Sequence, residues 1–176
     1  CGGSCAPAKT CADTKGCNVP ADCTSGVCTN NVCIAPTCND GVQNGLEGGL
    51  DCGAVCPIKC PDASTCLGAA DCVSGVCTLG VCQPAGCGDT VKNGTETDVD
   101  CGGSCAPANK CADLKACGGA GDCTSDVCTN NVCQVPTCSD TKKNGVETDV
   151  DCGGSCATKC IDGKVCALAA DCQSGV

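Results

Sequence analysis

Two segments of the chain gather carboxylate and amide side chains between cysteines in the same order. They read CGDTVKNGTETDVDCGG from Cys87 and CSDTKKNGVETDVDCGG from Cys138. Hard cations such as Ca²⁺ prefer oxygen ligands from Asp, Glu, Asn and main-chain carbonyl groups spaced along a turning loop. The pattern therefore predicts a calcium ion in each segment. The expected ligands are Asp89, Asn93, Glu96, Asp98 and Asp100 in the first segment, and Asp140, Asn144, Glu147, Asp149 and Asp151 in the second.

A third segment, CNDGVQNGLEGGLDCG from Cys38, keeps only part of this set. Gly48 and Gly49 stand where the other two segments have Thr and Asp. We expect this segment to bind calcium most weakly. Its remaining candidate ligands are Asp40, Asn44, Glu47 and Asp51. The competing interpretation, which the sequence leaves open, is that the Asp and Asn residues of all three segments cap turns and keep the loops solvated.

A potential N-glycosylation site lies inside the segment that begins at Cys87. The sequon is Asn93-Gly94-Thr95, and it predicts a glycan on Asn93. Because a glycan and a calcium ion would both use the side-chain amide of Asn93, the two predictions compete at this position.

The acidic segments join the units of a cysteine repeat. Its units start at Cys1, Cys52, Cys101 and Cys152, which divides the chain into repeats 1–51, 52–100 and 101–151 and a partial repeat 152–176. An aspartate precedes the fifth cysteine of every unit, and we expect it to cap a local turn; these residues are Asp22, Asp71, Asp122 and Asp171. The cysteines of the second and third units are Cys52, Cys56, Cys60, Cys66, Cys72, Cys77, Cys82 and Cys87, and Cys101, Cys105, Cys111, Cys117, Cys123, Cys128, Cys133 and Cys138.

Composition indicates that disulfides take the place of a hydrophobic core. The 176 residues include 29 cysteines and no Phe, Trp, Tyr or Met, so the large side chains that supply most burial energy are missing. So high a cysteine content is typical of secreted disulfide scaffolds, which exist in oxidising surroundings. We therefore expect an extracellular or cell-surface protein with about four disulfides in each repeat.

The pairing of the cysteines cannot be read from their order. A unit of eight cysteines allows about 105 pairings. Thiolate metal sites usually place their ligands in CxxC motifs, and the chain contains neither CxxC nor CxC. The spacing thus favours disulfides over a thiolate metal cluster.

Local sequence predicts little regular structure. Short Val, Cys and Thr runs flank Asn30-Asn31, Leu79-Gly80 and Asn130-Asn131, which is typical of two-residue β-hairpins. No window has the apolar period of a helix, and Gly, Pro, Asn and Asp interrupt the chain throughout. We expect small disulfide-rich tandem repeats made mostly of loops and turns, with short hairpins and negligible helix. Stacked repeats would form an elongated rod or fibre.

Several function classes are disfavoured by what the sequence lacks. Without His there is no Ser/His or Cys/His pair, and without Arg or aromatic residues the usual substrate clamps are missing. We therefore expect no enzymatic activity. A formal charge of −10 disfavours nucleic acid as a partner, and no apolar stretch is long enough to span a membrane.

The motif that ends at Cys101-Gly102-Gly103 resembles the CxDGxxNGxETDxDCGG cysteine-rich tandem repeats of long secreted or surface proteins of myxobacteria and unicellular eukaryotes. The matching residues are Cys87, Asp89, Asn93, Gly94, Glu96, Thr97, Asp98, Asp100, Cys101, Gly102 and Gly103, while Thr90 and Thr141 replace the first Gly of the motif. The resemblance covers essentially the whole chain. It implies an extracellular repeat architecture and carries no established biochemical role.

Repetition, cross-linking and the lack of catalytic chemistry favour a structural building block of an extracellular fibre, filament or surface appendage. A repeated surface makes self-association into a polymer geometrically easy. The alternative is a calcium-stiffened cell-surface stalk or adhesin module that binds carbohydrate or another surface. A toxin-like or inhibitor module fits the cysteine density, but no loop stands apart as a binding loop.

Overall fold

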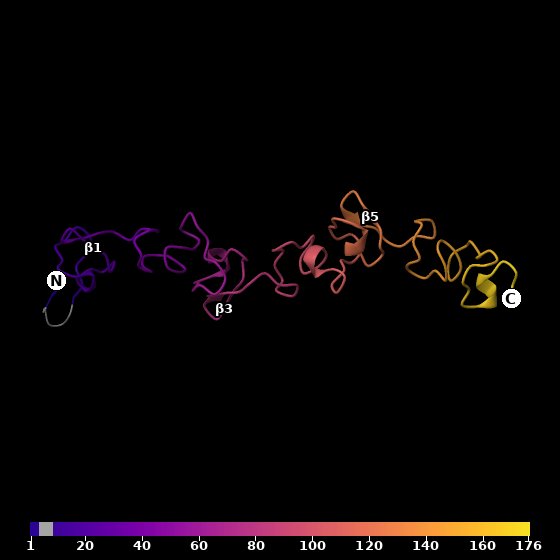
Figure 1. Cartoon of the computed structure of the whole chain (residues 1–176), viewed down its shortest axis with the longest axis horizontal. Coiled ribbons are helices and arrows are strands. Elements are labelled where there is room, and N and C mark those ends of the chain that lie inside the picture. Colours follow the sequence, from indigo (N-terminus) through magenta and orange to yellow (C-terminus); the bar gives the residue numbers. More distant parts are fainter. Residues whose placement is uncertain (4–8) are drawn as a thin grey trace. The chain divides into compact units, whose positions relative to one another are not determined.

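Antiparallel hairpins supply the regular β-structure of the computed structural model, which describes residues 1–3 and 9–176 (Figure 1). They pair β1 (Cys28–Thr29) with β2 (Val32–Cys33), β3 (Cys77–Thr78) with β4 (Val81–Cys82), and β5 (Cys128–Thr129) with β6 (Val132–Cys133). Both turn residues of the first hairpin are left-handed, with φ of 49° at Asn30 and 63° at Asn31. Two positive φ angles in succession define the type I′ turn, so the predicted two-residue hairpins are confirmed.

Helix in the described part of the chain is limited to single 3₁₀ turns. They are η1 (Pro20–Asp22), η2 (Ala69–Asp71), η3 (Gly103–Cys105), η4 (Ala120–Asp122) and η5 (Ala169–Asp171). Four of these turns end at the aspartate that precedes the fifth cysteine. Short turns and hairpins without longer helices match the predicted class of small disulfide-rich repeats.

Main-chain hydrogen bonds hold the segment after the third cysteine against the hairpin. In the first repeat, the Thr14 amide donates to the Cys33 carbonyl at 2.7 Å, and the Cys33 amide donates to the Lys15 carbonyl at 2.8 Å. The third repeat has the same bonds between Leu114, Lys115 and Cys133. Each of the first three repeats thus carries a turn fixed to its second hairpin strand.

The disulfides follow one rule along the chain. The first cysteine of a repeat pairs with the third, in Cys1–Cys11, Cys52–Cys60, Cys101–Cys111 and Cys152–Cys160. The fourth pairs with the sixth, in Cys17–Cys28, Cys66–Cys77 and Cys117–Cys128. The fifth pairs with the seventh, in Cys23–Cys33, Cys72–Cys82 and Cys123–Cys133. The eighth pairs with the second cysteine of the next repeat, in Cys38–Cys56, Cys87–Cys105 and Cys138–Cys156.

Two cysteines fall outside this rule. Cys166 and Cys172, the fourth and fifth of the last repeat, bond to each other, and the printed sequence contains no sixth or seventh cysteine for that repeat. Cys5, the second cysteine of the first repeat, lies outside the described residues.

Cysteine sulfur makes the core. In the described part of the chain, every buried apolar side chain larger than alanine belongs to a cysteine, and Cys11, Cys60 and Cys111 are fully buried. The aliphatic residues lie outside: Leu46 is 74% exposed and Leu67 75%. This distribution bears out the expectation that covalent cross-links replace a hydrophobic core.

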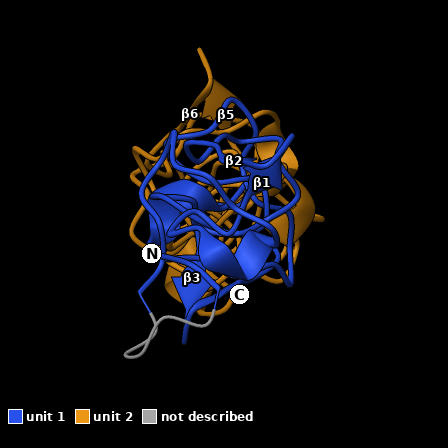
Figure 2. Cartoon of the chain, turned by 90° about the vertical axis from the view of Figure 1, so that its left-hand side faces the viewer, with its two compact units in different colours: residues 1–85 blue, residues 86–176 orange. Residues whose placement is uncertain are grey.

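The chain divides into two compact units, residues 1–85 and 86–176 (Figure 2). Each unit holds its own cysteine clusters, and the four repeats remain a division of the sequence. Among the described residues, no helix is long and apolar enough to cross a membrane. The fourteen disulfides of the described residues indicate an oxidising environment.

Candidate functional site in the acidic loops

The disulfide from one repeat to the next closes each acidic segment into a loop. We call residues 38–56, 87–105 and 138–156 the first, second and third acidic loops; each is bounded by the eighth cysteine of one repeat and the second cysteine of the next. All the calcium ligands predicted from the sequence lie within these loops. Each predicted set of ligands thus lies within one segment bounded by a disulfide.

In the second loop, two aspartates bind main-chain amides across the loop. Asp89 accepts hydrogen bonds from the amides of Gly86 and Val91, both at 2.9 Å, and from the side-chain amide of Asn93 at 2.9 Å. Asp100 accepts from the amides of Asp89 at 2.9 Å and Thr90 at 3.0 Å. The two carboxylates therefore hold the beginning and the end of the loop together.

The other two loops repeat this arrangement. Asp140 accepts from the amides of Thr137 at 2.7 Å and Lys142 at 3.0 Å, and Asp151 accepts from the Thr141 amide at 3.0 Å. In the first loop, Asp40 and Asp51 accept hydrogen bonds from the equivalent main-chain amides. These contacts favour the turn interpretation of the aspartates, because their oxygens are already hydrogen-bonded to the loop itself.

A glutamate occupies the same position in each loop; Glu47 and Glu96 are buried, and Glu147 is half-buried. Oε2 of Glu96 accepts from the amides of Asn93 at 3.3 Å and Asp100 at 3.2 Å. Its Oε1 lies 3.3 Å from Sγ of Cys105, and this sulfur is in a disulfide and carries no hydrogen. Glu47 contacts Cys56 in the same way, at 3.9 Å. One oxygen of each of these two glutamates is thus buried without a hydrogen-bond donor from these contacts.

A fourth carboxylate anchors the second and third loops to the repeat that follows. Oδ2 of Asp98 accepts from the Ala116 amide at 2.8 Å, and Oδ1 lies 3.5 Å from Nζ of Lys115. Asp149 makes the equivalent bond to the Val165 amide at 2.7 Å and lies 3.8 Å from Nζ of Lys164. The first loop has Gly49 at this position, and its bond to the following repeat is instead the one that the Thr65 hydroxyl donates to Oε1 of Gln43 at 3.3 Å.

The aspartate before the fifth cysteine does more than cap its own turn. Oδ2 of Asp71 accepts from the amides of Leu67 and Gly68, which is the predicted local cap, while Oδ1 accepts from the Ala54 amide at 2.8 Å. Asp71 is only 5% exposed. One buried carboxylate therefore fastens the turn after the first cysteine to the 3₁₀ turn before the fifth. The same three-amide pattern occurs at Asp22, Asp122 and Asp171.

These hydrogen bonds make the aspartates stronger acids. Main-chain amides that donate to the carboxylate favour its charged form. The amides of Ala54 and Leu67 lower the pKa of Asp71, and those of Ala116 and Val99 lower the pKa of Asp98, in both cases against the opposing effect of burial. For Asp89, the Asn93 side chain is the largest cause of a lowered pKa. The folded chain thus stabilises ionised carboxylates.

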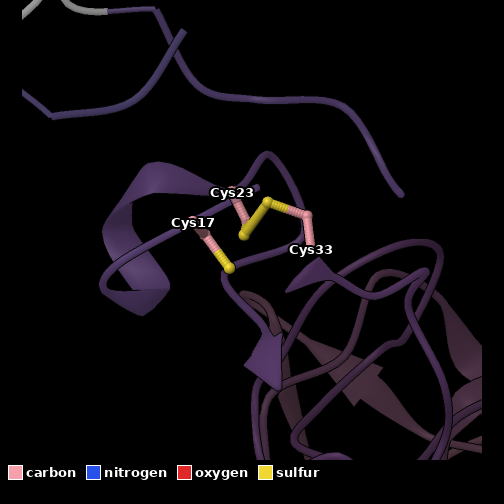
Figure 3. Close-up of side chains that lie close together, drawn as sticks. All are labelled: Cys17, Cys23 and Cys33. Carbon is pink, nitrogen blue, oxygen red and sulfur yellow. A yellow bond between two sulfur atoms is a disulfide. The ribbon is translucent and has the colours of Figure 1, made fainter. Parts of the chain in front are cut away.

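Sulfur atoms also lie close enough together to suggest metal sites. Cys17, Cys23 and Cys33 have their sulfurs within 4.8 Å of one another, and the sulfurs of Cys23 and Cys33 are bonded (Figure 3). Cys17 is bonded to Cys28. Sulfur in a disulfide is not a thiolate, the form that binds zinc. These three side chains therefore build the core.

A different set of atoms bears on the calcium prediction. In the first and third loops, the buried amide oxygens of Asn44 and Asn144 accept no hydrogen bond from any described residue. Their nitrogens donate to the carbonyls of Ser25 and Ser125 at 2.8 and 2.6 Å, which fixes the amide orientation. Buried oxygens without a donor call for an ordered water or a cation. Among the predicted calcium ligands, these two amide oxygens are ones that a Ca²⁺ ion could meet without breaking a loop hydrogen bond.

The predicted glycosylation site lies within the same hydrogen-bonded region. The Asn93 side-chain nitrogen donates to Oδ2 of Asp89 at 2.9 Å. At Asn144, the equivalent nitrogen donates to both the Ser125 carbonyl and Asp140. A glycan on Asn93 replaces one hydrogen of an amide that the fold uses, so glycosylation and loop closure compete.

In comparisons with known proteins, no family model, curated protein or solved structure matches this chain.

Proposed function

We propose that this protein is a structural building block of an extracellular fibre, filament or surface appendage, and that it has no enzymatic activity. The observation that carries the proposal is the disulfide from the eighth cysteine of each repeat to the second cysteine of the next. These bonds cross the sequence boundaries between repeats, so successive repeats are covalently locked and not merely packed together.

The use of the polar residues also supports a mechanical role. Catalysis by carboxylates needs an oxygen that can reach a substrate and exchange a proton with it. In the acidic loops, the aspartate oxygens accept main-chain hydrogen bonds, and Glu47 and Glu96 are buried. The side chains with the most suitable chemistry therefore serve the loops that connect the repeats.

Electron microscopy of the oxidised protein, purified without reductant, tests this proposal. We expect regular fibres that disappear after the disulfides are reduced and alkylated. Mass spectrometry with and without reductant provides the control that cysteines are paired in the imaged material. Monodisperse single chains at all concentrations would contradict the filament role and favour a stalk or adhesin.

The second candidate is a calcium-stiffened stalk or adhesin module, which the donor-free oxygens of Asn44 and Asn144 favour. A ligand that binds only the folded state increases the free energy of unfolding, by about 2.7 kcal/mol at a concentration one hundred times its Kd. The melting temperature rises as a result. Since the chain has no aromatic residue, melting is best followed by calorimetry. A calcium-dependent shift that Glu147→Gln, in the loop of Asn144, weakens and Asp126→Asn leaves intact would support this role. Identical melting curves in calcium and in EDTA would rule it out.

A further inference from the structure

One carboxylate in each repeat has no structural contact. Among the described residues, Asp13, Asp62, Asp113 and Asp162 form neither a hydrogen bond nor an ion pair. Every other aspartate and glutamate accepts at least one hydrogen bond or forms an ion pair. The four exceptions occupy the same position, two residues after the third cysteine. The fold therefore does not explain why an acid recurs there.

The turn that carries this aspartate is fixed to the hairpin in the first three repeats. In the first repeat, the Lys15 amide donates to the Ala12 carbonyl at 3.2 Å, and the Thr14 amide donates to Cys33 on β2 at 2.7 Å. Thr14 has a φ of 69°, which is rare for a β-branched residue. The residue after the aspartate differs in all four repeats, and the residue before it is Ala in two of them: Ala-Asp-Thr, Pro-Asp-Ala, Ala-Asp-Leu and Ile-Asp-Gly. Only the acid is constant on a preorganised turn.

A hollow beside Asp13 offers room for a partner side chain. It has a volume of about 410 Å³ and is lined by Ala12, Asp13, Thr24, Ser25, Pro36 and Gly45. The third repeat has the same residue types at all six positions: Ala112, Asp113, Thr124, Ser125, Pro136 and Gly145. A carboxylate, a threonine hydroxyl and a proline ring suit the ammonium group and the aliphatic stem of a lysine.

Several lysines of the described chain form no side-chain hydrogen bond or ion pair, and two of them recur at one position of the acidic loops. Lys92 and Lys143 occupy the same position in the second and third acidic loops, are exposed, and form neither a hydrogen bond nor an ion pair in the described structure. In contrast, Lys110, Lys115 and Lys164 pair with aspartates of the same chain. The loops that hold Lys92 and Lys143 are closed by disulfides, so these positions are rigidly presented as well.

We propose that the free aspartates of one chain bind Lys92 and Lys143 of a second copy, and that these ion pairs form the lateral contact between chains. This inference rests on the proposed structural role. Exposed ion pairs are individually weak, but pairs that recur along both chains act together, because the first contact raises the effective concentration of the next. The net charge of −10 opposes association at low ionic strength, so we expect the contact to need enough salt to screen the long-range repulsion while leaving the short-range ion pairs intact.

Sedimentation velocity of neutralised variants tests the proposal. The fourfold variant Asp13→Asn, Asp62→Asn, Asp113→Asn and Asp162→Asn removes four negative charges without removing an internal hydrogen bond. We expect its melting curve to match the wild type and its assembly to weaken by at least about tenfold. The matched control adds four positive charges at exposed sites elsewhere, through Thr29→Lys, Thr78→Lys, Thr129→Lys and Thr158→Lys. It makes the same change in net charge, and we expect it to assemble.

A charge-exchange experiment identifies the partner. One chain carries the four aspartates as lysines, and another carries Lys92→Asp and Lys143→Asp. We expect each variant alone to stay monomeric, and the mixture to assemble with a salt dependence like that of the wild type. If the wild type assembles and the fourfold Asp→Asn variant assembles equally well, the lateral contact is wrong while the structural role stands. If the wild type itself never assembles, both proposals fall.

Discussion

The first acidic loop and its two later copies share a closing disulfide but are held in different ways. In the second and third loops, a threonine packs against the glycine that follows the first cysteine of the next repeat, Thr97 against Gly102 and Thr148 against Gly153. Asp98 and Asp149 bind the next repeat. The first loop has Gly48 and Gly49 there. Instead, the Gln43 side chain donates to the Gly48 carbonyl at 2.9 Å and accepts from the Thr65 hydroxyl of the next repeat at 3.3 Å. A neutral side chain from the first half of the loop therefore both closes the loop and binds it to the next repeat.

The aspartate that binds the next repeat and the lysine that pairs with it are present or absent together. Asp98 faces Lys115, and Asp149 faces Lys164. Where Gly49 replaces the aspartate, the position of the lysine is Ser64. A lysine without its acid would gain nothing from this location, so the ion pair is present or absent as a unit. The first loop is thus a coherent alternative and not a damaged copy.

The glycines after the first cysteine differ accordingly. A Cβ atom on Gly154 would lie 1.8 Å from the Val146 carbonyl oxygen, and one on Gly103 would lie 1.9 Å from that of Thr95. The equivalent residue after the first loop is Ala54, whose amide donates to Asp71. The later loops pass so close to this turn that only glycine fits, whereas the first loop leaves room for a methyl group.

The largest effect we expect is from Gly154→Ala. The added methyl group collides with main-chain atoms and the residue has a φ of +60°, so the variant should lose about 3 kcal/mol of stability. The matched control is Ala54→Gly, which should cost no more than about 1 kcal/mol. Calorimetry of both variants measures the difference. Equal losses would show that the two loops approach the turn alike.

The next effect concerns the glycines of the first loop. A Cβ on Gly48 would lie 2.3 Å from Cγ of the buried Asp71, so Gly48→Thr should cost about 2 kcal/mol, although it restores the residue of the later loops. The reverse change, Thr97→Gly, creates no collision and should cost about 1 kcal/mol through chain entropy. A stabilised Gly48→Thr protein would mean that the first loop is only a decayed copy.

The second and third loops should respond to low pH more strongly than the first, because each carries an additional carboxylate. The pKa values of Asp98 and Asp149 are lowered by main-chain amides. A carboxylate with a lowered folded pKa contributes stability above its unfolded pKa of about 3.9, and loses it as the pH falls through the folded value. We expect stability to be flat near neutral pH and to drop below about pH 4. Asp98→Asn with Asp149→Asn should make this drop shallower, and an unchanged slope would contradict the role of these two groups.

The sequence was sufficient for the hairpins and the absence of an apolar core. Asn-Asn and Leu-Gly turns specify a local geometry, and a chain without large apolar residues cannot build an ordinary interior. The disulfide pairing was out of reach, because spacing alone cannot reveal that Cys38 bonds to Cys56 in the following repeat. The hydrogen bond from the Ala54 amide to Asp71, seventeen residues away, was missed because a cap is recognised only from neighbouring residues.

One part of the site was readable and was overlooked. Asp98 with Lys115 and Gly49 with Ser64 change together within a single chain, which is a signal of contact that needs only the internal repeats. The calcium ligands illustrate the opposite limit. Residue types predict which oxygens a cation prefers, but only the fold determines which of those oxygens already have a donor, as Asp100 does.

The smallest effect we expect is the coupling between Asp98 and Lys115. Their side chains are 22% and 51% exposed and 3.5 Å apart, so solvent screens the pair and a double-mutant cycle should yield about 0.5 kcal/mol. Asp98→Ala should cost more than Lys115→Ala, because it also leaves the Ala116 amide without its acceptor. The coupling should vanish at about 1 M salt, while the difference between the two single variants persists.

Transplanting the pair completes this test. Gly49→Asp with Ser64→Lys places both charges in the first loop, but the aspartate Cβ would lie 2.9 Å from the Thr65 carbonyl oxygen. We therefore expect the double variant to be less stable than the wild type, with no measurable coupling. A favourable coupling there would show that the main chain of the first loop can adopt the geometry of the later loops, and that the glycines are not what separates them.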